Sequence, residues 1–444
     1  METIIIIVFL AGYLAITLEH TIKIDKLIPA LAMMAILWAI IALNHMQVFE
    51  VNTLLQELEP IGIDAILLHH LGKTAEILVF LLGAMTIVEI IDYFDGFATI
   101  KGYIRTRSKK KLLWLFCILA FILSAIIDNL TATIVLITIL QKVINDRNTR
   151  LWFAGMIIIA ANAGGAWSPI GDVTTTMLWI ADKVSAGQLV IHVLVPSIVC
   201  MIVPTVIASY NKAFQGQIEG QIVNESPKSK YGSTMLYLGL GAIVFVPFFK
   251  TVTHLPPYVG MMLSLAVVAT FAEIYSNKKF SITSIDNGAH QEEGHHSPVH
   301  HSLSKIELPS ILFFLGILLA VAALESLGML FHYAEGLREA IPNTDIVVML
   351  FGVGSAVIDN VPLVAASMGM FGEAMDSPLW HFIAYSAGTG GSMLIIGSAA
   401  GVVAMGMEKI DFFWYFKNIA WLAMAGFVSG AVVFILLRDF VLHG

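Results

Sequence analysis

One short string occurs twice in this chain, and both copies lie inside long apolar sequence. Residues 124–129 read Ser-Ala-Ile-Ile-Asp-Asn, and residues 355–360, which start 231 positions later, read Ser-Ala-Val-Ile-Asp-Asn. An ionisable side chain at membrane depth is costly and marks a functional site by default. The repeat therefore predicts two related halves that each contribute an acid and an amide to one place, as in many ion-coupled transporters.

The composition is that of a polytopic membrane protein. Of 444 residues, 58% are hydrophobic and only 13% are charged, whereas soluble globular domains hold about 25% charged residues. The first apolar stretch, 3–18, has no basic segment before it and no small-residue cleavage site after it, so we expect a retained helix. Cys117 and Cys200 both lie in apolar segments and are expected to be free, buried thiols.

Several classes of function are disfavoured. The net charge of −8 is spread over loops without a continuous basic face, so nucleic acid is not an expected partner. The sequence Gly72-Lys73-Thr74 lacks the upstream glycine of a P-loop because position 67 is Leu, so nothing supports ATP-driven transport. No nucleophile–base pair or paired-histidine metal motif lies within the apolar spans. We therefore expect a secondary transporter without a cofactor, rather than an enzyme.

Charged residues in the loops orient the spans. The loop with Lys23 and Lys26 and the basic cluster within 101–111 are expected on the cytoplasmic side, whereas 44–70 carries four acids and no Lys or Arg and is expected outside. Segment 112–141 has basic residues at both ends but is too short for two crossings at 1.5 Å per residue. It is predicted to be a re-entrant hairpin with Asp128 and Asn129 at its tip.

Segment 346–371 is predicted to be a second hairpin, with Asp359 and Asn360 near its middle, that enters from the external side. Entry from opposite sides is what an inverted repeat requires. The predicted fold class is all-α, with ten full spans, two inverted-topology repeats and both termini external. The predicted divisions are an N-terminal helix and loop (1–26), a first repeat (27–210) with hairpin 112–141 and broken helix 151–179, a cytoplasmic linker (211–232), and a second repeat (233–444) with a His-rich loop (276–305), hairpin 346–371 and broken helix 379–405.

A glycine-interrupted helix follows each hairpin. Residues 162–172 and 388–398 both contain Gly-Gly followed six positions later by Gly. Such breaks free backbone groups and expose half-helix ends that hold ions. Nearby hydroxyls supply the neutral oxygen donors that a small hard cation prefers; they belong to Thr131, Thr133, Thr174, Thr175, Thr176 and Ser392. The halves differ, since Asn162 and Asp172 stand where the second half has Gly388 and Ser398.

If tips and breaks meet at the midplane, Asp128, Asp172 and Asp359 gather in one cavity. Three desolvated carboxylates would not all stay ionised without cations, so they could alternate between a proton and a metal cation. Simpler readings stay open. An Asp-Asn pair also caps helices, and Gly-Gly also serves close packing. Asp92 and Glu325 lie near span ends and are predicted to be interfacial, with a role in the ion path as the less favoured alternative.

The histidines are given the simpler readings too. The His-rich loop is expected to be a solvated linker rather than a metal site or pH sensor. His192, alone in an apolar span, is expected to be structural, with coupling to proton movement as the alternative.

With these motifs the chain resembles the NhaD-type sodium/proton antiporters of the ion transporter superfamily, which also holds arsenite permeases and divalent anion/sodium symporters. The paired Ser-Ala-x-Ile-Asp-Asn strings and the run 162–175 (NAGGAWSPIGDVTT) are its specific features. By this resemblance the polar positions of ion binding and exchange are Asp128, Asn129, Asn162, Asp172, Thr174, Thr175, Ser355, Asp359 and Asn360, with sodium at the three Asp residues. Secondary candidates are Ser124, Thr131, Ser392, Ser398 and His192.

The resemblance further implies export of sodium or lithium in exchange for protons, in a bacterial inner membrane and as a homodimer. The expected partners are therefore these ions, protons and the lipid bilayer. The alternative is an ion-coupled permease for arsenite or an organic anion. Divalent anion symporters carry neutral Ser-Asn-Thr strings at the corresponding places, so the added Asp charge argues against an anionic substrate here.

Overall fold

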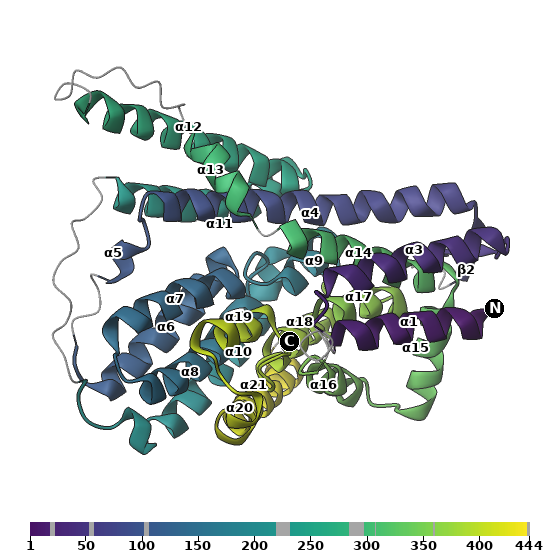
Figure 1. Cartoon of the computed structure of the whole chain (residues 1–444). Helices are drawn as coiled ribbons and strands as arrows, with labels where there is room; N and C mark the ends of the chain where they lie inside the picture. The colour runs from purple at the N-terminus through teal and green to yellow at the C-terminus, as the bar shows by residue number, and fades with distance from the viewer. Residues whose placement is uncertain are drawn as a thin grey trace. The chain divides into compact units, whose positions relative to one another are not determined.

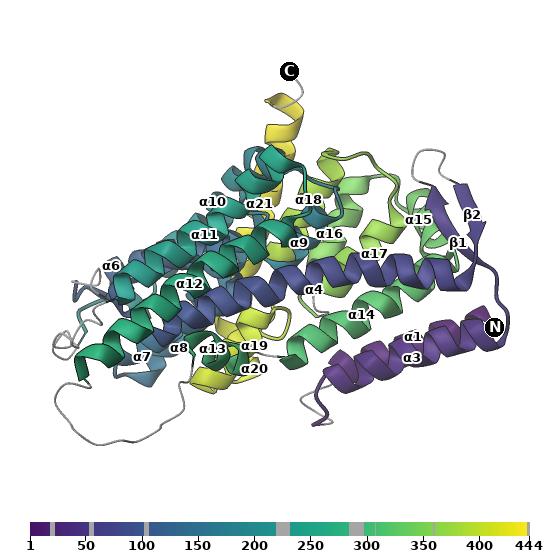
Figure 2. The ribbon, with the colours of Figure 1, turned by 90° about the horizontal axis from the view of Figure 1, so that it is seen from above.

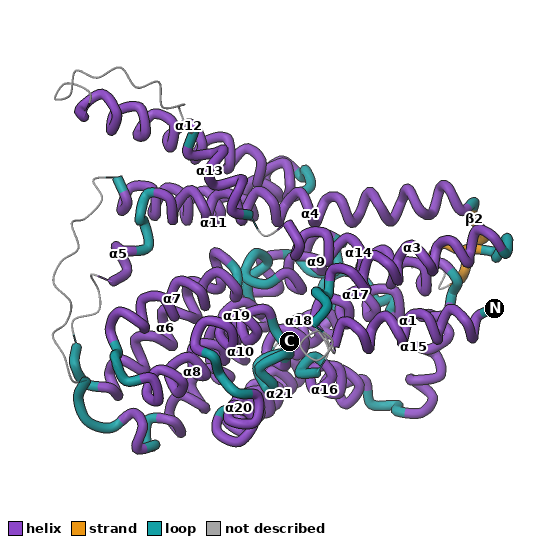
Figure 3. Tube along the Cα trace, viewed as in Figure 1, coloured by secondary structure: helices purple, strands orange, loops and turns teal. Residues whose placement is uncertain are grey.

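The computed structural model describes residues 1–17, 23–52, 57–101, 106–218, 231–283, 297–306, 308–357 and 360–441. Helices make up nearly all of this part of the chain (Figures 1 and 3). Seven of the described helices are long and apolar enough to cross a membrane: Ile63–Tyr93, Lys109–Ile127, Ala186–Ala208, Gly232–Thr253, Pro257–Ser276, Leu308–Ser326 and Ala420–Phe440. The predicted all-helical, multi-pass fold class is confirmed.

The chain forms two compact units. The first contains Met1–Leu78, Ser108–Ile218 and Pro309–Gly444, and the second contains Val79–Arg107 and Glu219–Leu308. The first unit includes α1 (Glu2–Thr17), α3 (Leu27–Leu43), β1 (Val48–Asn52), β2 (Glu57–Ile61), the start of α4 (Ile63–Tyr93), α6 (Lys109–Ile127), α7 (Asn129–Val143), α8 (Arg147–Ala166), α9 (Val173–Ile180), α10 (Ala186–Ala208), α14 (Leu308–Ser326), α15 (Met329–Ala340), α16 (Thr344–Gly354), α17 (Asn360–Met370), α18 (Pro378–Gly390), α19 (Ala399–Glu408), α20 (Phe412–Asn418) and α21 (Ala420–Phe440).

The second unit is a small helical assembly. Besides the remainder of α4 it contains α5 (Ala98–Lys101), α11 (Gly232–Thr253), α12 (Pro257–Thr283) and α13 (Pro298–Lys305). Ser264 on α12 donates a 2.7 Å hydrogen bond to the Ala242 carbonyl of α11. The predicted His-rich loop 276–305 is helical at both ends. Its first residues continue α12, and its last residues form α13, a helix that starts at Pro298 and is capped by Ser297. Residues 284–296 lie outside the described part.

Two short strands are an element that the sequence analysis did not predict. Strands β1 and β2 pair in antiparallel register, with Val48 opposite Ile61 and Glu50 opposite Glu59 (Figure 2). The acidic residues in 44–70 pointed to an external loop. The pattern Val-Phe-Glu-Val in β1 is nevertheless compatible with a strand that has one buried face, and Val48 is buried.

Helices α6 and α7 form a hairpin. At its open end, Lys109 of α6 donates to Thr149 Oγ1 at 3.3 Å, and the Arg150 guanidinium donates to the Ile144 carbonyl directly after α7. Thr149 and Arg150 both lie in the first turn of α8, so the start of α6 and the end of α7 are neighbours. The turn between the two helices is Asp128, which adopts a φ of 79°. This places Asp128 and Asn129 at the tip, where the sequence predicted them.

Helices α16 and α17 fold back on each other in a similar way. Phe371, directly after α17, packs against Phe351 of α16 and Trp380 in the first turn of α18, with ring centroids 6.2 and 6.5 Å apart. The end of α17 therefore lies beside α16. Residues 358 and 359, including Asp359, lie outside the described residues, and Asn360 is the first residue of α17.

The two halves repeat one another in their contacts. Ser124 of α6 donates to the Ala161 carbonyl of α8 at 2.6 Å, and Ser355 after α16 donates to the Ala387 carbonyl of α18 at 3.0 Å. Each half thus packs the first arm of its hairpin on the helix that later breaks. Across the halves, α7 packs on α19 and α17 packs on α9. The orientation of the halves in a membrane, and with it the inverted topology, stays a prediction.

Close helix contact at the two breaks requires glycine. A Cβ atom built on Gly164 would overlap the Phe121 carbonyl oxygen and lie 2.7 Å from Phe121 Cα, and one built on Gly390 would overlap the Gly352 carbonyl oxygen. These are equivalent positions in the two halves. The glycines therefore set the distance between each hairpin and its broken helix.

Replacing Gly164 by Ala should destabilise the protein by about 1–3 kcal/mol, because backbone atoms rather than a flexible side chain block the new methyl group. The matched control is Gly406→Ala, since no heavy atom lies within 4 Å of a Cβ built on Gly406. There the expected change is a gain of about 0.5–1 kcal/mol from helix propensity. Thermal unfolding of purified protein in detergent measures both. Equal midpoints for the two variants would contradict the packing described here.

Candidate functional site

The two helix breaks each end in a residue that caps the helix after the break. Asp172 precedes α9, and its Oδ1 accepts from the Thr174 amide at 3.2 Å. Ser398 precedes α19, and its Oγ accepts from the Gly401 amide, also at 3.2 Å. Both caps have extended backbone, as N-cap residues do. The breaks therefore direct an acid and a hydroxyl inward at equivalent points.

One hydrogen-bonded network joins both hairpin tips to both breaks. Asp172 Oδ2 accepts from Nδ2 of Asn129 and from Nδ2 of Asn360, each at 3.2 Å. Asn129 Nδ2 also lies 3.1 Å from Asn162 Oδ1, and Asn162 Nδ2 donates to Ser398 Oγ at 3.0 Å. We call these five residues the Asp172 network. Its members come from residues 129 to 398 of the chain and are brought together only by folding.

The Asp172 network is almost completely closed to solvent. Asp172 is 3% exposed and Asn162 is 0% exposed. A charged carboxylate there is stabilised only by hydrogen bonds or by a cation. The two amide donors and the positive end of α9 supply part of that stabilisation. A cation entering the network would find carboxylate, amide and hydroxyl oxygens, the ligands of hard monovalent and divalent ions.

Two hydroxyls beside this network have no hydrogen-bond partner among the described residues. They are Oγ1 of Thr174, in the first turn of α9, and Oγ1 of Thr133, one turn after Asn129 on α7. Both residues are 0% exposed. A buried hydroxyl without a partner is uncommon, so these oxygens are free to accept a ligand.

Asp128 lies at the first tip but faces its own helix. Its Oδ1 accepts from the Thr131 amide at 2.8 Å and its Oδ2 from the Thr131 hydroxyl at 2.9 Å. This is the helix-capping interaction that the sequence allowed. Asp128 thereby fixes the start of α7 and directs the adjacent Asn129 toward Asp172. Asp359, the other predicted tip acid, lies outside the described residues.

Other predicted residues bond to backbone. Thr175 Oγ1 donates to the Asp172 carbonyl at 2.9 Å and Ser392 Oγ to the Thr389 carbonyl at 2.6 Å. Ser124 and Ser355 hold the helices together as described above. His192 Nδ1 lies 2.8 Å from the Gln188 carbonyl, and its ring stacks on His381 at 4.4 Å. Of these contacts, only that of Thr175 reaches a member of the Asp172 network, and it is made to the backbone carbonyl rather than to the carboxylate.

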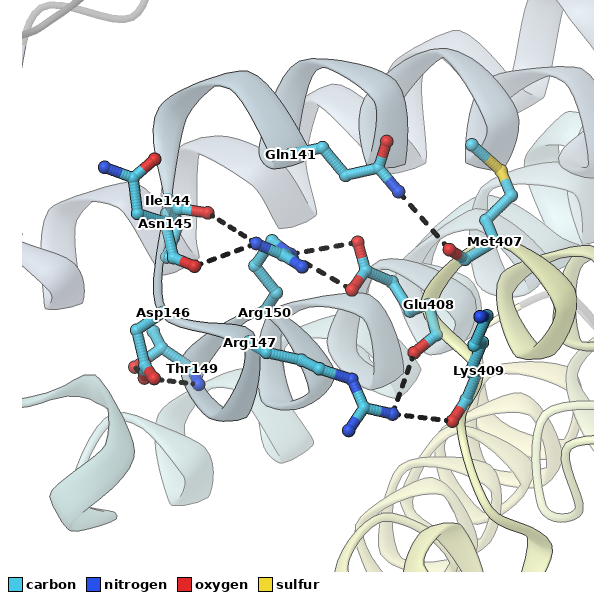
Figure 4. Close-up of polar contacts among 10 residues, drawn as sticks. All are labelled: Gln141, Ile144, Asn145, Asp146, Arg147, Thr149, Arg150, Met407, Glu408 and Lys409. Atoms are coloured by element: carbon cyan, nitrogen blue, oxygen red, sulfur yellow. Dashed lines mark hydrogen bonds and ion pairs between the residues drawn. The ribbon is translucent and has the colours of Figure 1, made fainter.

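A charged cluster at the open end of the first hairpin was not predicted. Arg150 Nε lies 3.1 and 3.0 Å from the two carboxylate oxygens of Glu408, the last residue of α19 (Figure 4). Arg147 donates to the Glu408 and Lys409 carbonyls, and Gln141 donates to the Met407 carbonyl. Arg147 and Arg150 belong to the basic residues that follow segment 112–141, which the sequence analysis used only to orient the hairpin. This cluster ties the end of α7 and the start of α8 to the end of α19.

Asp146 caps α8 next to this cluster. Hydrogen bonds from the hydroxyl and amide of Thr149, both to Oδ2 at 2.6 and 2.8 Å, lower the pKa of the Asp146 carboxyl. The carboxylate therefore stays ionised at neutral pH and holds the first turn of α8, which carries Arg150.

Removing Arg150 and removing Glu408 should lower the stability of the fold by different amounts. The Glu408 side chain is 1% exposed and that of Arg150 is 19% exposed. A buried carboxylate without its partner is therefore more destabilising than a partly exposed guanidinium without its partner. We expect Arg150→Met to destabilise by about 3–5 kcal/mol and Glu408→Gln by about 1–3 kcal/mol.

The double variant Arg150→Met with Glu408→Gln removes both charges and should recover most of the stability lost in Arg150→Met. Thermal unfolding in detergent gives all four values of the cycle. Additive losses in the double variant would mean that the two side chains do not stabilise each other.

Comparison with known proteins places this architecture among transporters. The model of the family described as citrate transporter, CitMHS, matches residues 13–381. Sodium/proton antiporter 2 of Arabidopsis thaliana is 38% identical over 98% of this chain and 100% of its own length. Sodium/proton antiporter 1 of the same plant is 40% identical over 98% of this chain and 72% of its own length.

A bacterial relative also matches in sequence, and a solved structure matches in fold. The Na(+)/H(+) antiporter NhaD of Vibrio cholerae is 31% identical over 98% of this chain and 91% of its own length. The crystal structure of the Alcanivorax borkumensis YdaH transporter superimposes with a TM-score of 0.55 at 11% identity, covering 93% of this chain and 97% of that one. The predicted resemblance is confirmed: the chain is a multi-pass membrane transporter rather than an enzyme, and it belongs to the CitMHS citrate transporter family, together with the NhaD-type and plant sodium/proton antiporters.

Proposed function

We propose that this chain exchanges sodium or lithium ions for protons across a membrane, and that the Asp172 carboxylate alternately holds the cation and the proton. Relatives matching nearly the whole chain are named sodium/proton antiporters. One observation supports the proposal above all. A single buried carboxylate oxygen of Asp172 accepts a hydrogen bond from the side-chain amide at each hairpin tip, Asn129 and Asn360, at 3.2 Å.

The chemistry follows from the donors and acceptors present. An ionised carboxylate needs positive charge or donors around it, and the two amide groups provide donors in the absence of a cation. When a cation binds Asp172, each amide can turn its oxygen inward and become a ligand. When a proton binds instead, the carboxyl group becomes neutral and the cation loses its main ligand. Cation and proton therefore compete for one oxygen pair, which is the requirement for exchange.

The competing function is a permease for citrate, another organic anion or arsenite. The description of the matching family favours it. The buried Asp172 argues against an organic anion, because a carboxylate substrate at the same place would add a second negative charge in a site that is closed to solvent. The four other network members, three Asn and one Ser, carry no charge to offset it.

We also propose roles for two further acids and a cellular location for the protein. Asp128 and Asp359 are proposed to assist Asp172 as further carboxylates of the exchange, as their repeated motif suggests. A bacterial inner membrane, external termini and a homodimer are part of the proposal through the resemblance to NhaD-type proteins.

The test is exchange in proteoliposomes with an acidic interior, in which added sodium, lithium or potassium chloride dissipates the proton gradient. Wild-type protein should respond to sodium and lithium. Asp172→Asn should lower the rate at least about tenfold, since it removes a charge-assisted ligand worth about 1.5–3 kcal/mol. Asp128→Asn and Asp359→Asn should lower it as well.

Asp64→Asn is the matched control, because Asp64 is an exposed acid in the first turn of α4, and it should exchange like wild type. Citrate and arsenite are offered in separate arms. Gradient dissipation by citrate but by none of the three cations would refute antiport and favour the permease. Full activity of Asp172→Asn would remove this carboxylate from the mechanism.

A further inference from the structure

A cavity in the first unit carries a set of charged groups outside the Asp172 network. Its volume is about 310 Å³, and β1, α4, α9, α14 and α17 all contribute to its wall. A polar cavity of this volume has room for several water molecules. The titratable side chains that line it are Glu50, His69, His70, Lys73, Lys183 and Glu325.

Glu325 lies at the inner side of this cavity, in the last turn of α14. A Cβ atom built on Gly369 of α17 would lie 3.2 Å from both Cγ and Cδ of Glu325. The carboxyl group therefore rests against the backbone of α17 at a glycine, next to the side chain of Leu330. The sequence had favoured an interfacial role for Glu325. The structure places it at the end of α14 and against the helix that begins with Asn360, and the interfacial position stays a prediction.

The charges of the cavity balance. Glu50 and Glu325 supply two carboxylates, and Lys73 of α4 and Lys183 after α9 supply two ammonium groups. Burial lowers the pKa of Lys183, and the negative charge of Glu325 opposes this effect. His69 lies 3.7 Å from Glu50, and His70 lies 3.1 Å from the Ser326 hydroxyl. Two lysines thus share the cavity with Glu325, and the Lys183 ammonium group lies over the Trp380 ring, 4.8 Å from its centroid.

The inner wall of the cavity comes close to the Asp172 network. Met177 of α9 and Ala365 of α17 line it, and each lies five residues after a network member, Asp172 and Asn360 respectively. At 1.5 Å per residue this is about 7.5 Å along each helix axis. The same two helices therefore lead from the cavity to the network.

The equivalent place in the other half is filled. There α7 packs on α19, and Gln141 and Glu408 take part in the charged cluster of Figure 4. The repeat places Gly372 at the position of Gln141. The spacing that pairs Asp172 with Ser398 places Asp182, two residues after the end of α9, at the position of Glu408. Gly372 and Ala181 both line the cavity. A glycine thus stands in the cavity wall at the position where Gln141 takes part in the charged cluster of the other half.

From these observations we infer that this cavity is the aqueous entrance to the Asp172 network, and that Glu325 binds the entering monovalent cation or proton in competition with Lys183, which lines the same cavity. This inference rests on the proposed antiport. One carboxylate with a lysine as competitor holds such an ion weakly and releases it onward. Ca²⁺ and Mg²⁺ need six or more oxygen ligands, and the described residues contain no group of three or more His, Cys, Asp or Glu that could hold a metal ion.

The first test uses two substitutions with opposite expected signs. Glu325→Gln should raise the apparent KM for sodium about threefold or more with little change in maximal rate, because Asp172 is intact and only entry is weakened. Lys183→Gln should lower the apparent KM, because the competitor for Glu325 is gone. In the Glu325→Gln background, Lys183→Gln should have no further effect.

Lys110→Gln removes the same charge on α6, where the ammonium group lies over the Tyr210 ring, and should leave the KM unchanged. If Lys183→Gln lowers the KM equally with and without Glu325, the lysine acts through the general field and the role of Glu325 is refuted. If Glu325→Gln and Lys183→Gln both behave like wild type, the inference falls while antiport stands.

The second test needs no transport. Positions 137 and 368 are equivalent in the repeat, but Met368 lines the cavity and Ile137 is 0% exposed. A membrane-impermeant methanethiosulfonate reagent should label Met368→Cys and not Ile137→Cys, and the native Cys117 and Cys200 are both buried. Labelling of Ile137→Cys alone would place the entrance at the other end. If Met368→Cys is labelled but the wild-type protein exchanges no ions, the antiport proposal is refuted and only the access of solvent to the cavity remains supported.

Discussion

The arrangement of the first unit depends on one buried carboxylate. Asp172 begins a helix inside apolar sequence, where its charge is costly unless donors or a cation surround it. The donors come from Asn129 and Asn360, which lie at the tips of two different hairpins. Both tips therefore have to reach the same oxygen, and the helices that carry them have to lie close. The glycines at the breaks make that approach sterically allowed.

Two equivalent helix contacts end differently. Where α7 meets α19, Arg150 and Glu408 form an ion pair at the open end of the first hairpin. Where α17 meets α9, Gly372 and Ala181 line a cavity that also holds two acidic side chains and two lysines. A duplicated architecture with unequal side chains at its ends can thus keep one route to its centre closed and the other open. Alternation between the two would need the Arg150–Glu408 pair to separate, and water would have to reach Glu408 to offset the cost.

Many residues of the site could be named from the sequence because short local motifs contain them. The twofold Asp-Asn string, the Gly-Gly breaks and the Asn-to-Asp run 162–172 predicted the hairpin tips, the broken helices and the polar residues between them. Their mutual bonds were not predictable, because Asn162 and Ser398 are 236 residues apart and no local rule pairs them. Asp128 illustrates the limit: its motif suggested a place beside Asp172, yet a local hydrogen bond to Thr131 turns its carboxylate toward α7.

By itself, the sequence determined that this chain is an all-helical membrane protein built from related halves with acids and amides at their interrupted helices, since hydropathy, repeats and glycine spacing are local properties. The tertiary structure alone decided which of those groups meet. Arg150 with Glu408 and Glu325 with Gly369 come from distant segments whose polar residues looked like ordinary span ends. Long-range packing set their neighbours, and the neighbours, not the residue types, made one contact an ion pair and the other the wall of a cavity.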